Sequence, residues 1–188
     1  MRLRSVPLPW LVLVGLLLGL LAGPAGAIDV GDPAPNFTLY NLDGLPYTLT
    51  EYGSHPVLLV FLDCEQAASG QLASRLQSDL YLPYSSKGMF VLGLDCRGCS
   101  AESIRDFGDK AAVTFPLLMK GAPVQELYDL PVNSVVLVDG GGVVRYLSEG
   151  PDIGAYNATE IRSAVDGALR DANTTKTATW GLIKSLYK

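Results

Sequence analysis

Residues 57–62 read Val-Leu-Leu-Val-Phe-Leu, an unbroken apolar run that directly follows His55-Pro56. A strand that is apolar on both faces lies inside a sheet that helices cover on both sides. The segment that follows, residues 65–85, is richer in Ala, Gln, Ser and Leu. Its leucines recur every fourth residue, at Leu72, Leu76 and Leu80. This spacing is typical of one face of an α-helix, so the chain predicts a buried strand followed by a helix that packs on it.

Strands and helices alternate along the rest of the chain. The other expected elements are a hairpin of residues 37–40 and 47–50, a strand at 89–94, a helix at 101–110 with Ser100 as N-cap, an edge-like piece at 115–118, helical turns at 124–128, paired strands at 135–138 and 143–147, and a helix capped by Asn157. Such alternation predicts an α/β fold with right-handed crossovers and helices on both faces of a central mixed sheet. We expect this sheet to be mostly parallel, with the last hairpin as an antiparallel edge.

The first 27 residues, Met1–Ala27, have the pattern of a signal peptide. Arg2 and Arg4 form a basic front, Leu11–Ala22 is apolar, and Ala25-Gly-Ala27 offers small residues for cleavage. The apolar run is shorter than the roughly 20 residues that a membrane span needs, although a retained anchor is the alternative. We therefore expect an exported protein, periplasmic or extracellular, without stable membrane insertion after cleavage.

The C-terminal end differs in composition from the domain that precedes it. We predict a domain over residues 28–170, and a polar linker at Asp171–Thr179 because that segment lacks periodicity. Residues 180–188 form a short amphipathic segment with Trp180, Ile183 and Leu186 on one side. It either docks on its own domain or serves as a recognition tag.

Composition excludes several classes of protein. The chain has 188 residues, of which 48% are hydrophobic, and this apolar fraction excludes disorder. Three cysteines are too few for a disulfide-dense mini-protein. The balance of 14 Lys and Arg against 19 Asp and Glu gives a net charge of −5. An acidic surface argues against nucleic acid and anionic lipid as partners.

The three cysteines follow the first two buried strands. Cys64 comes just after residues 57–62, and Cys96 and Cys99 follow residues 89–94. Because parallel strands end at the same edge of a sheet, we expect all three sulfurs to gather there, with Cys64 within roughly 10 Å of Cys96. Cys96-Arg-Gly-Cys99 also precedes a helix, whose dipole favours a thiolate. The spacing lets a second thiol resolve a mixed disulfide formed at the first.

Two other roles for the cysteines remain open. One is a static staple, either Cys96–Cys99 or Cys64–Cys96. The other is a zinc site in which His55 joins the three thiols. His55 enters the strand that Cys64 leaves, about 30 Å away at 3.3 Å per residue, so Asp63 or Asp95 would have to be the fourth ligand. We expect neither a metal nor a bound cofactor.

Several framework motifs carry a family resemblance. Gly31-Asp-Pro-Ala-Pro35 with Phe37 is similar to a G-x-x-A-P-x-F opening, and residues 88–95 and Asp139-Gly140 follow in the same order as in the redoxin branch of the thioredoxin fold. That branch includes the alkyl hydroperoxide reductase and thiol-specific antioxidant group and the exported thiol–disulfide oxidoreductases. The resemblance runs from about Ile28 to Arg170 and implies a thioredoxin-like fold.

The catalytic motif of the family is missing. Counted from Phe61, its C-x-x-C falls on Gln66 and Ser69, and its cis-proline falls on Asn133, with Pro131 close by. The peroxidase pattern P-x-x-x-T-x-x-C is absent as well. We therefore do not carry the family's standard catalytic residues over to these positions.

Two hypotheses of different classes follow. The first is an exported redoxin, either a thiol–disulfide oxidoreductase or an antioxidant thiol peroxidase. Cys96 and Cys99 would be its attacking and resolving pair, and Cys64 a possible third partner. Its substrate would be a protein thiol or disulfide or a small peroxide, with an external thiol as electron donor. The second is a catalytically degenerate binding or structural module that keeps a structural disulfide.

Overall fold

The computed structural model describes residues 27–150 and 157–186, with the backbone alone described over 173–186. Within these residues, no helix combines the length and the hydropathy that a membrane crossing requires. The signal peptide predicted for Met1–Ala27 lies outside the described residues except for its last residue. The end of the predicted C-terminal segment, residues 187–188, also lies outside them.

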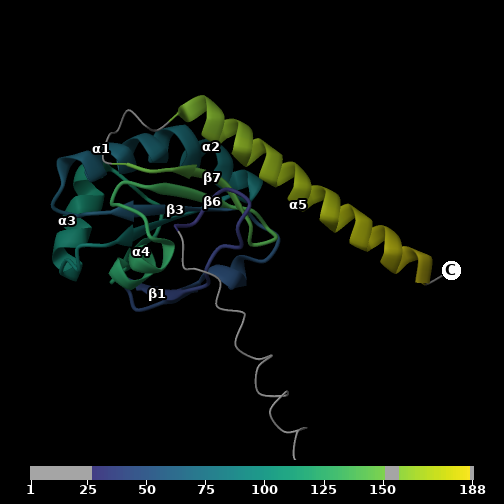
Figure 1. Ribbon diagram of the computed structural model, residues 1–188, viewed down its shortest axis with the longest axis horizontal. Coiled ribbons are helices and arrows are strands. Elements are labelled where there is room, and N and C mark those ends of the chain that lie inside the picture. The colour runs from purple at the N-terminus through teal and green to yellow at the C-terminus, as the bar shows by residue number, and fades with distance from the viewer. Residues whose placement is uncertain (1–26, 151–156, 187–188) are drawn as a thin grey trace, which may run out of the picture.

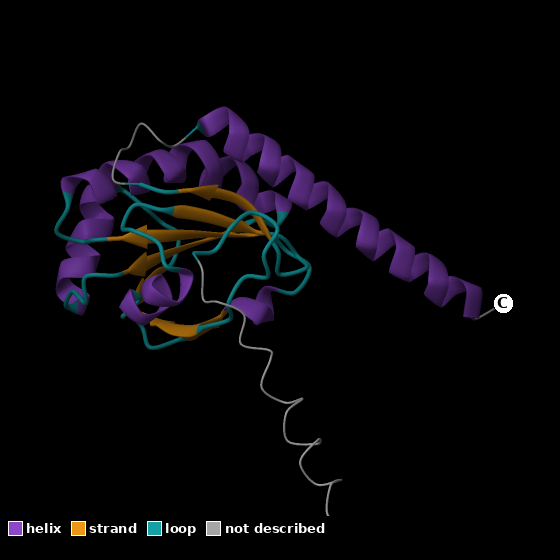
Figure 2. Ribbon diagram, viewed as in Figure 1, coloured by secondary structure: helices purple, strands orange, loops and turns teal. Residues whose placement is uncertain are grey.

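A mixed sheet forms the centre of the molecule (Figures 1 and 2). In the described part of the chain it has seven strands in the order β2-β1-β5-β4-β3-β6-β7. They are β1 (Thr38–Asn41), β2 (Pro46–Thr48), β3 (Val57–Leu62), β4 (Phe90–Asp95), β5 (Leu117–Met119), β6 (Val135–Val138) and β7 (Val144–Ser148). The expected α/β fold, with its mixed sheet and N-terminal hairpin, is confirmed.

Helices cover both faces of this sheet. The main ones are α1 (Ala67–Leu76), α3 (Ala101–Ala111), α4 (Ala122–Tyr128) and α5 (Ala158–Leu186). Shorter turns are η1 (Leu49–Tyr52), η2 (Gln77–Tyr81), α2 (Leu82–Tyr84) and η3 (Ser85–Lys87). The helices α1, α3 and α5 contribute to the core on one face, and α4 contributes to the core on the other.

Strand β3 is the centre of both cores. All six of its residues are buried, as the unbroken apolar run predicts. Leu58, Val60 and Leu62 belong to the core under α1, α3 and α5. The alternate residues, among them Leu59 and Phe61, belong to the core under α4. This alternation follows from the geometry of a strand, whose successive side chains point to opposite faces.

Two expectations about the sheet are wrong. Only the β3–β4 and β4–β5 pairs are parallel in the described residues, and the other four pairs are antiparallel. The segment at residues 115–118 was expected at an edge, but β5 lies between β1 and β4. Apolar patterns report how deeply a strand is buried. They carry no information on its direction or on its neighbours, which depend on the path of the connections.

The predicted linker at Asp171–Thr179 is helical instead, because α5 continues through it without a break. That segment contains neither proline nor glycine, so nothing in it stops a helix that has already begun. The start of α5 is as predicted, since Asn157 Oδ1 accepts hydrogen bonds from the N–H groups of Thr159 and Glu160. In Figure 1 the C-terminal part of α5 extends away from the sheet. The division of the chain at Arg170 stays a prediction.

Replacing Leu58 by alanine tests the central position of β3. Leu58 is completely buried, so Leu58→Ala should lower the free energy of unfolding by about 2–5 kcal/mol. Leu82→Ala is the matched control, because Leu82 is 62% exposed and its loss should cost less than about 0.5 kcal/mol. Urea unfolding with the disulfide intact measures both. Equal destabilisation by the two substitutions would contradict this description of the core.

Candidate active site

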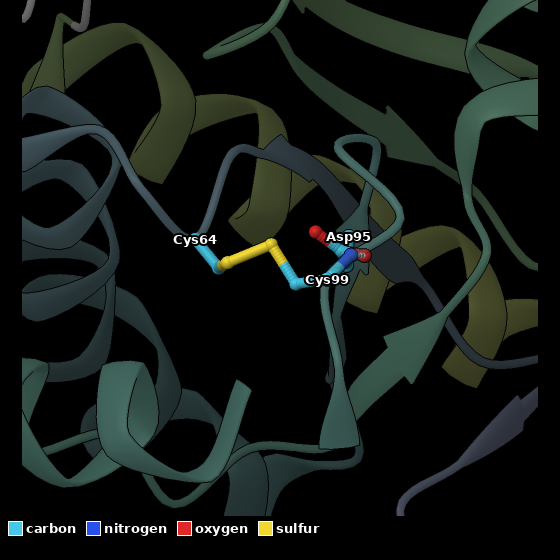
Figure 3. A group of neighbouring side chains, drawn as sticks. All are labelled: Cys64, Asp95 and Cys99. Atoms are coloured by element: carbon cyan, nitrogen blue, oxygen red, sulfur yellow. Dashed lines mark hydrogen bonds between the residues drawn. A yellow bond between two sulfur atoms is a disulfide. The ribbon is translucent and has the colours of Figure 1, made fainter. Parts of the chain in front are cut away.

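A disulfide joins Cys64 and Cys99 at the carboxyl edge of the two central parallel strands (Figure 3). Their Cα atoms are 6.6 Å apart, within the range that a disulfide spans. Cys64 lies in the turn after β3, and Cys99 directly precedes Ser100, the N-cap of α3. Strands β3 and β4 bring the two loops together, because Leu62 and Asp95 are partners in register at the strand ends.

This pairing is neither of the two that the sequence suggested. Cys96 is a free cysteine, so neither Cys96–Cys99 nor Cys64–Cys96 is formed. Cys96 packs against the core on the α4 face, whereas Cys64 packs against the core on the opposite face. Cys96 lies at the predicted edge, since its N–H donates to the carbonyl oxygen of Leu62, but it packs on the face opposite to Cys64. The reason is the alternation along β4, which turns Asp95 and Cys96 to opposite sides of the sheet.

The environment of Cys96 suppresses its reactivity. Burial, together with the negative charge of Asp95, raises the pKa of the Cys96 thiol to about 12. Its Sγ lies 3.4 Å from the carbonyl oxygen of Leu94, to which it donates a hydrogen bond. The thiolate is the reactive form of cysteine, and a thiol with so high a pKa stays protonated near neutral pH.

Asp95 organises the loop that carries Cys99. Its carboxyl oxygens accept hydrogen bonds from the backbone N–H groups of Arg97, Gly98 and Cys99, at 3.3, 3.0 and 2.8 Å. Gly98 has a φ of +79°, which glycine adopts without strain and which lets the loop turn back over the carboxylate. Sequence reasoning considered Asp95 only as a possible metal ligand. The signal that it missed is an Asp at a strand end, three residues before a glycine.

In the described part of the chain, one group of side chains has the composition and spacing to hold a metal ion. It consists of Cys64, Asp95 and Cys99, whose ligand atoms lie within 4.8 Å of one another. The two sulfurs are bonded to each other, so neither is available to a metal in this oxidation state. His55 is not in the group. It lies before β3, at the opposite end of that strand, where its Nδ1 is 3.0 Å from the carbonyl oxygen of Tyr52.

The positions of the missing family motif take part in a polar network instead, in which Ser69 and Asn133 are buried and Gln66 is exposed. Ser69 Oγ accepts a hydrogen bond from the Asp63 N–H and donates one to Asn133 Oδ1, at 3.0 and 2.6 Å. The N–H of Asn133 donates to the carbonyl oxygen of Phe61. Gln66 donates from Nε2 to the Asp63 carboxylate. These bonds join the start of α1 to the loop before β6 and hold the turn that carries Cys64.

A groove between α1 and α3 leads to Cys64. It has a volume of about 550 Å³ and is lined by residues of both helices and of the Cys64 turn. We call it the α1–α3 groove. Its charged lining residues are Glu65, Asp106 and Lys110. Glu65 also forms an exposed ion pair with Arg97, at 3.2 Å, between the same two loops that the disulfide joins.

Comparison with known proteins identifies the family of this chain. Residues 30–147 match the model of the AhpC/TSA family. The chain belongs to that family. The resemblance read from the framework motifs is thereby confirmed.

Curated relatives of two kinds are similar to this AhpC/TSA member. A putative chloroplastic peroxiredoxin Q of Oryza sativa subsp. indica is 28% identical over 131 residues, which cover 65% of this chain and 59% of the rice protein. The thiol-disulfide oxidoreductase ResA of Geobacillus thermodenitrificans is 27% identical over 131 residues, covering 66% of this chain and 71% of that protein. The chain thus matches somewhat more than half the length of its peroxiredoxin Q relatives.

Solved structures show the same fold. A putative protein disulfide isomerase from Bacteroides thetaiotaomicron has a TM-score of 0.66 at 24% identity, covering 79% of this chain and 95% of its own. A putative thiol:disulfide interchange protein DsbE from Chlorobium tepidum has a TM-score of 0.66 at 19% identity, covering 76% and 99%. These likenesses establish the thioredoxin-like fold of the AhpC/TSA domain.

The Ser69 network gives a stability prediction. Ser69→Ala removes a hydroxyl that bonds both Asp63 and Asn133, and both partners are buried. Leaving them unpaired should lower the free energy of unfolding by about 1–3 kcal/mol in urea denaturation. Ser74→Ala, at an exposed position of the same helix, is the control and should be close to neutral. A Ser69→Ala protein as stable as the control would show that the network contributes nothing.

The cysteine pairing gives a chemical prediction. The unfolded, unreduced chain should show one free thiol, which peptide mapping should assign to Cys96, and three after reduction. In the native protein, Cys96 should react slowly with iodoacetamide near neutral pH and faster as the pH approaches about 12, because the thiolate fraction rises. Labelling of Cys64 or Cys99 before reduction would contradict this pairing.

Proposed function

We propose that this AhpC/TSA member is an exported thiol–disulfide oxidoreductase whose redox pair is Cys64 and Cys99. The observation that carries the proposal is the disulfide itself, placed between two loops at the carboxyl edge of β3 and β4. In α/β folds this edge is where reactive groups are presented. The α1–α3 groove gives the Cys64 side of the disulfide a path to solvent.

The reaction is an exchange of disulfides. A substrate thiolate attacks Cys64 Sγ, the bond between Cys64 and Cys99 breaks, and a mixed disulfide with Cys64 forms. Cys99 leaves with the electron pair and takes up a proton, since the nearby Asp95 carboxylate disfavours a lasting thiolate. A second substrate thiolate then attacks the mixed disulfide and releases Cys64. The substrate gains a disulfide, the protein gains two thiols, and the reverse sequence reduces a substrate disulfide.

Cys64 is the sulfur that the substrate attacks in this proposal. It lines the α1–α3 groove, and Cys99 is absent from the lining residues of that groove. Cys96 takes no part in the exchange, because it packs on the other face of the sheet and its pKa is raised. This assignment replaces the Cys96 and Cys99 pair that the C-x-x-C spacing suggested.

The substrate class follows from this chemistry. Protein or low-mass thiols and disulfides suit the exchange, with an external thiol restoring the starting state. Export is part of the proposal, because a disulfide persists outside the reducing cytosol and because Leu11–Ala22 has the pattern of a signal peptide core.

Thiol peroxidase activity is the second candidate, and the disulfide favours it too. A Cys64 thiolate would attack the peroxide, releasing an alcohol and leaving a sulfenic acid, and Cys99 would then displace water to give the same Cys64–Cys99 bond. The Asp95 carboxylate beside both sulfurs opposes the thiolate that the first step needs. Disulfide exchange is therefore the better supported of the two reactions.

A purely structural role is the opposing hypothesis, and the buried network of Ser69 and Asn133 favours it. In that case the disulfide is a staple, which would add about 3–4 kcal/mol by closing a loop across a separation of 35 residues. A staple of this kind resists mild reduction of the folded protein, whereas a redox pair cycles.

Single substitutions of the cysteines separate these roles. Cys64→Ser and Cys99→Ser should each reduce thiol–disulfide exchange to the uncatalysed background, since either change removes the disulfide. Cys96→Ser is the matched control and should retain most of the activity. The measurements are dithiothreitol-driven reduction of insulin and oxidation of a reduced peptide, with peroxide consumption followed in parallel. A native disulfide that dithiothreitol cannot reduce would overturn the proposal in favour of the staple.

A further inference from the structure

We propose that the Cys64–Cys99 site selects thiols that carry a positive charge beside the sulfur and discriminates against anionic thiols. This inference rests on the proposed exchange reaction and adds its substrate class. It comes from the distribution of charge around the disulfide.

A carboxylate lies beside the sulfurs without a cationic partner. Asp95 is 5% exposed, and one oxygen of its carboxyl group is within 4.8 Å of both sulfurs (Figure 3). In the part of the chain that the structure describes, its side-chain hydrogen bonds come from backbone N–H groups and no Lys or Arg pairs with it. Its negative charge is therefore spread over loop dipoles and is not neutralised.

A second buried carboxylate adds to this charge. Asp63 directly precedes Cys64 and is 7% exposed. Its oxygens accept hydrogen bonds from the backbone N–H of Glu65 and from Gln66 Nε2, which are neutral donors. Two adjacent loops of the site thus each hold a buried negative charge.

Two of the cations near the groove form ion pairs. Arg97 forms an ion pair with Glu65, and Lys110 forms one with Asp106 on the same helix. The rim of the α1–α3 groove is therefore close to neutral, and the negative charge of Asp63 and Asp95 lies behind it. These two carboxylates repel a thiolate that approaches Cys64 and oppose the attraction of the positive helix ends nearby.

The charge next to the attacking sulfur decides how strongly the two carboxylates oppose it. Every thiol attacks as a thiolate, so the common negative charge cancels when thiols are compared. An ammonium group beside the sulfur offsets the carboxylates, whereas a sulfonate or carboxylate adds to the repulsion. At separations below the Debye length of about 8–10 Å, such charges are incompletely screened, and a rate difference of about tenfold is expected between cationic and anionic thiols.

The substrates that suit this site are amino thiols and protein cysteines flanked by Lys or Arg. Glutathione, which carries a net negative charge, should be a poor partner. With this selectivity the protein would exchange disulfides with cysteines in basic protein segments and would react only slowly with anionic low-mass thiols.

Three small thiols of similar size test the inference on the oxidised full chain. They are cysteamine, which is cationic, β-mercaptoethanol, which is neutral, and mercaptoethanesulfonate, which is anionic. The rate of disulfide reduction by each is divided by its rate with 4,4′-dithiodipyridine, a neutral disulfide that derives from none of the three thiols, at the same pH, which removes differences in thiol pKa and nucleophilicity. The normalised rates should fall in that order, with about tenfold between the first and the last, and should converge at high ionic strength.

Asp95→Asn identifies the source of the selectivity. It removes the charge next to the sulfurs and keeps one oxygen as an acceptor, so the ratio of cysteamine to mercaptoethanesulfonate rates should fall severalfold. Asp43→Asn is the matched control with the same loss of charge. Asp43 lies in the turn between β1 and β2. This turn is at the end of the strands opposite to the site, because β1 runs antiparallel to β5 and β5 runs parallel to β4. Its ratio should stay at the wild-type value.

The outcomes separate this inference from the proposed function. Equal normalised rates for the three thiols, or a faster reaction with mercaptoethanesulfonate, would overturn the charge selectivity and leave the exchange reaction standing. Failure of all three thiols to reduce the folded protein would overturn the exchange reaction itself. The wild-type series decides the question even where Asp95→Asn fails to fold.

Discussion

The parallel pairing of β3 with β4 is the constraint on which the site depends. It aligns Leu62 with Asp95 at the end of both strands, so that the loops that leave them emerge side by side. The N–H of Cys96 donates to the carbonyl oxygen of Leu62, which extends the ladder one residue beyond the strand. Only with this register can Cys64 and Cys99, which are 35 residues apart, come within bonding distance. The buried side chains of β3 on both faces hold the pair in place.

Polar side chains also tie together the loops around Cys64. Gln66, Ser69 and Asn133 occupy the positions of the family motif, and hydrogen bonds join them to one another and to Asp63. Asn133 adopts a φ of +69°, which asparagine tolerates better than most residues. Hydrogen bonds between polar side chains and the backbone thus hold the turn at Cys64.

The sequence predicted the helices and strands themselves better than it predicted how they pair and pack. Strands 57–62 and 135–138 have the predicted bounds, and Ser100 and Asn157 cap helices as expected, because apolar periodicity and capping are local properties. The direction of β6, the interior place of β5 and the bond between Ser69 and Asn133 depend on segments far apart in the chain. The pairing of Cys64 with Cys99 was missed for a local reason, since C-x-x-C spacing was given more weight than the alternation of side chains along β4.

That alternation has an evolutionary consequence. Cys96 follows the alternation of β4 and packs on the α4 face, whereas Cys99 meets Cys64 because the loop turns back at Gly98. One residue inserted before Cys96 would turn the Cys96 side chain toward α3. The residues that follow Cys96 would each move to the next position along the chain path. A one-codon insertion would therefore bring a different cysteine to the Cys64 side of the sheet, without a new cysteine having to arise.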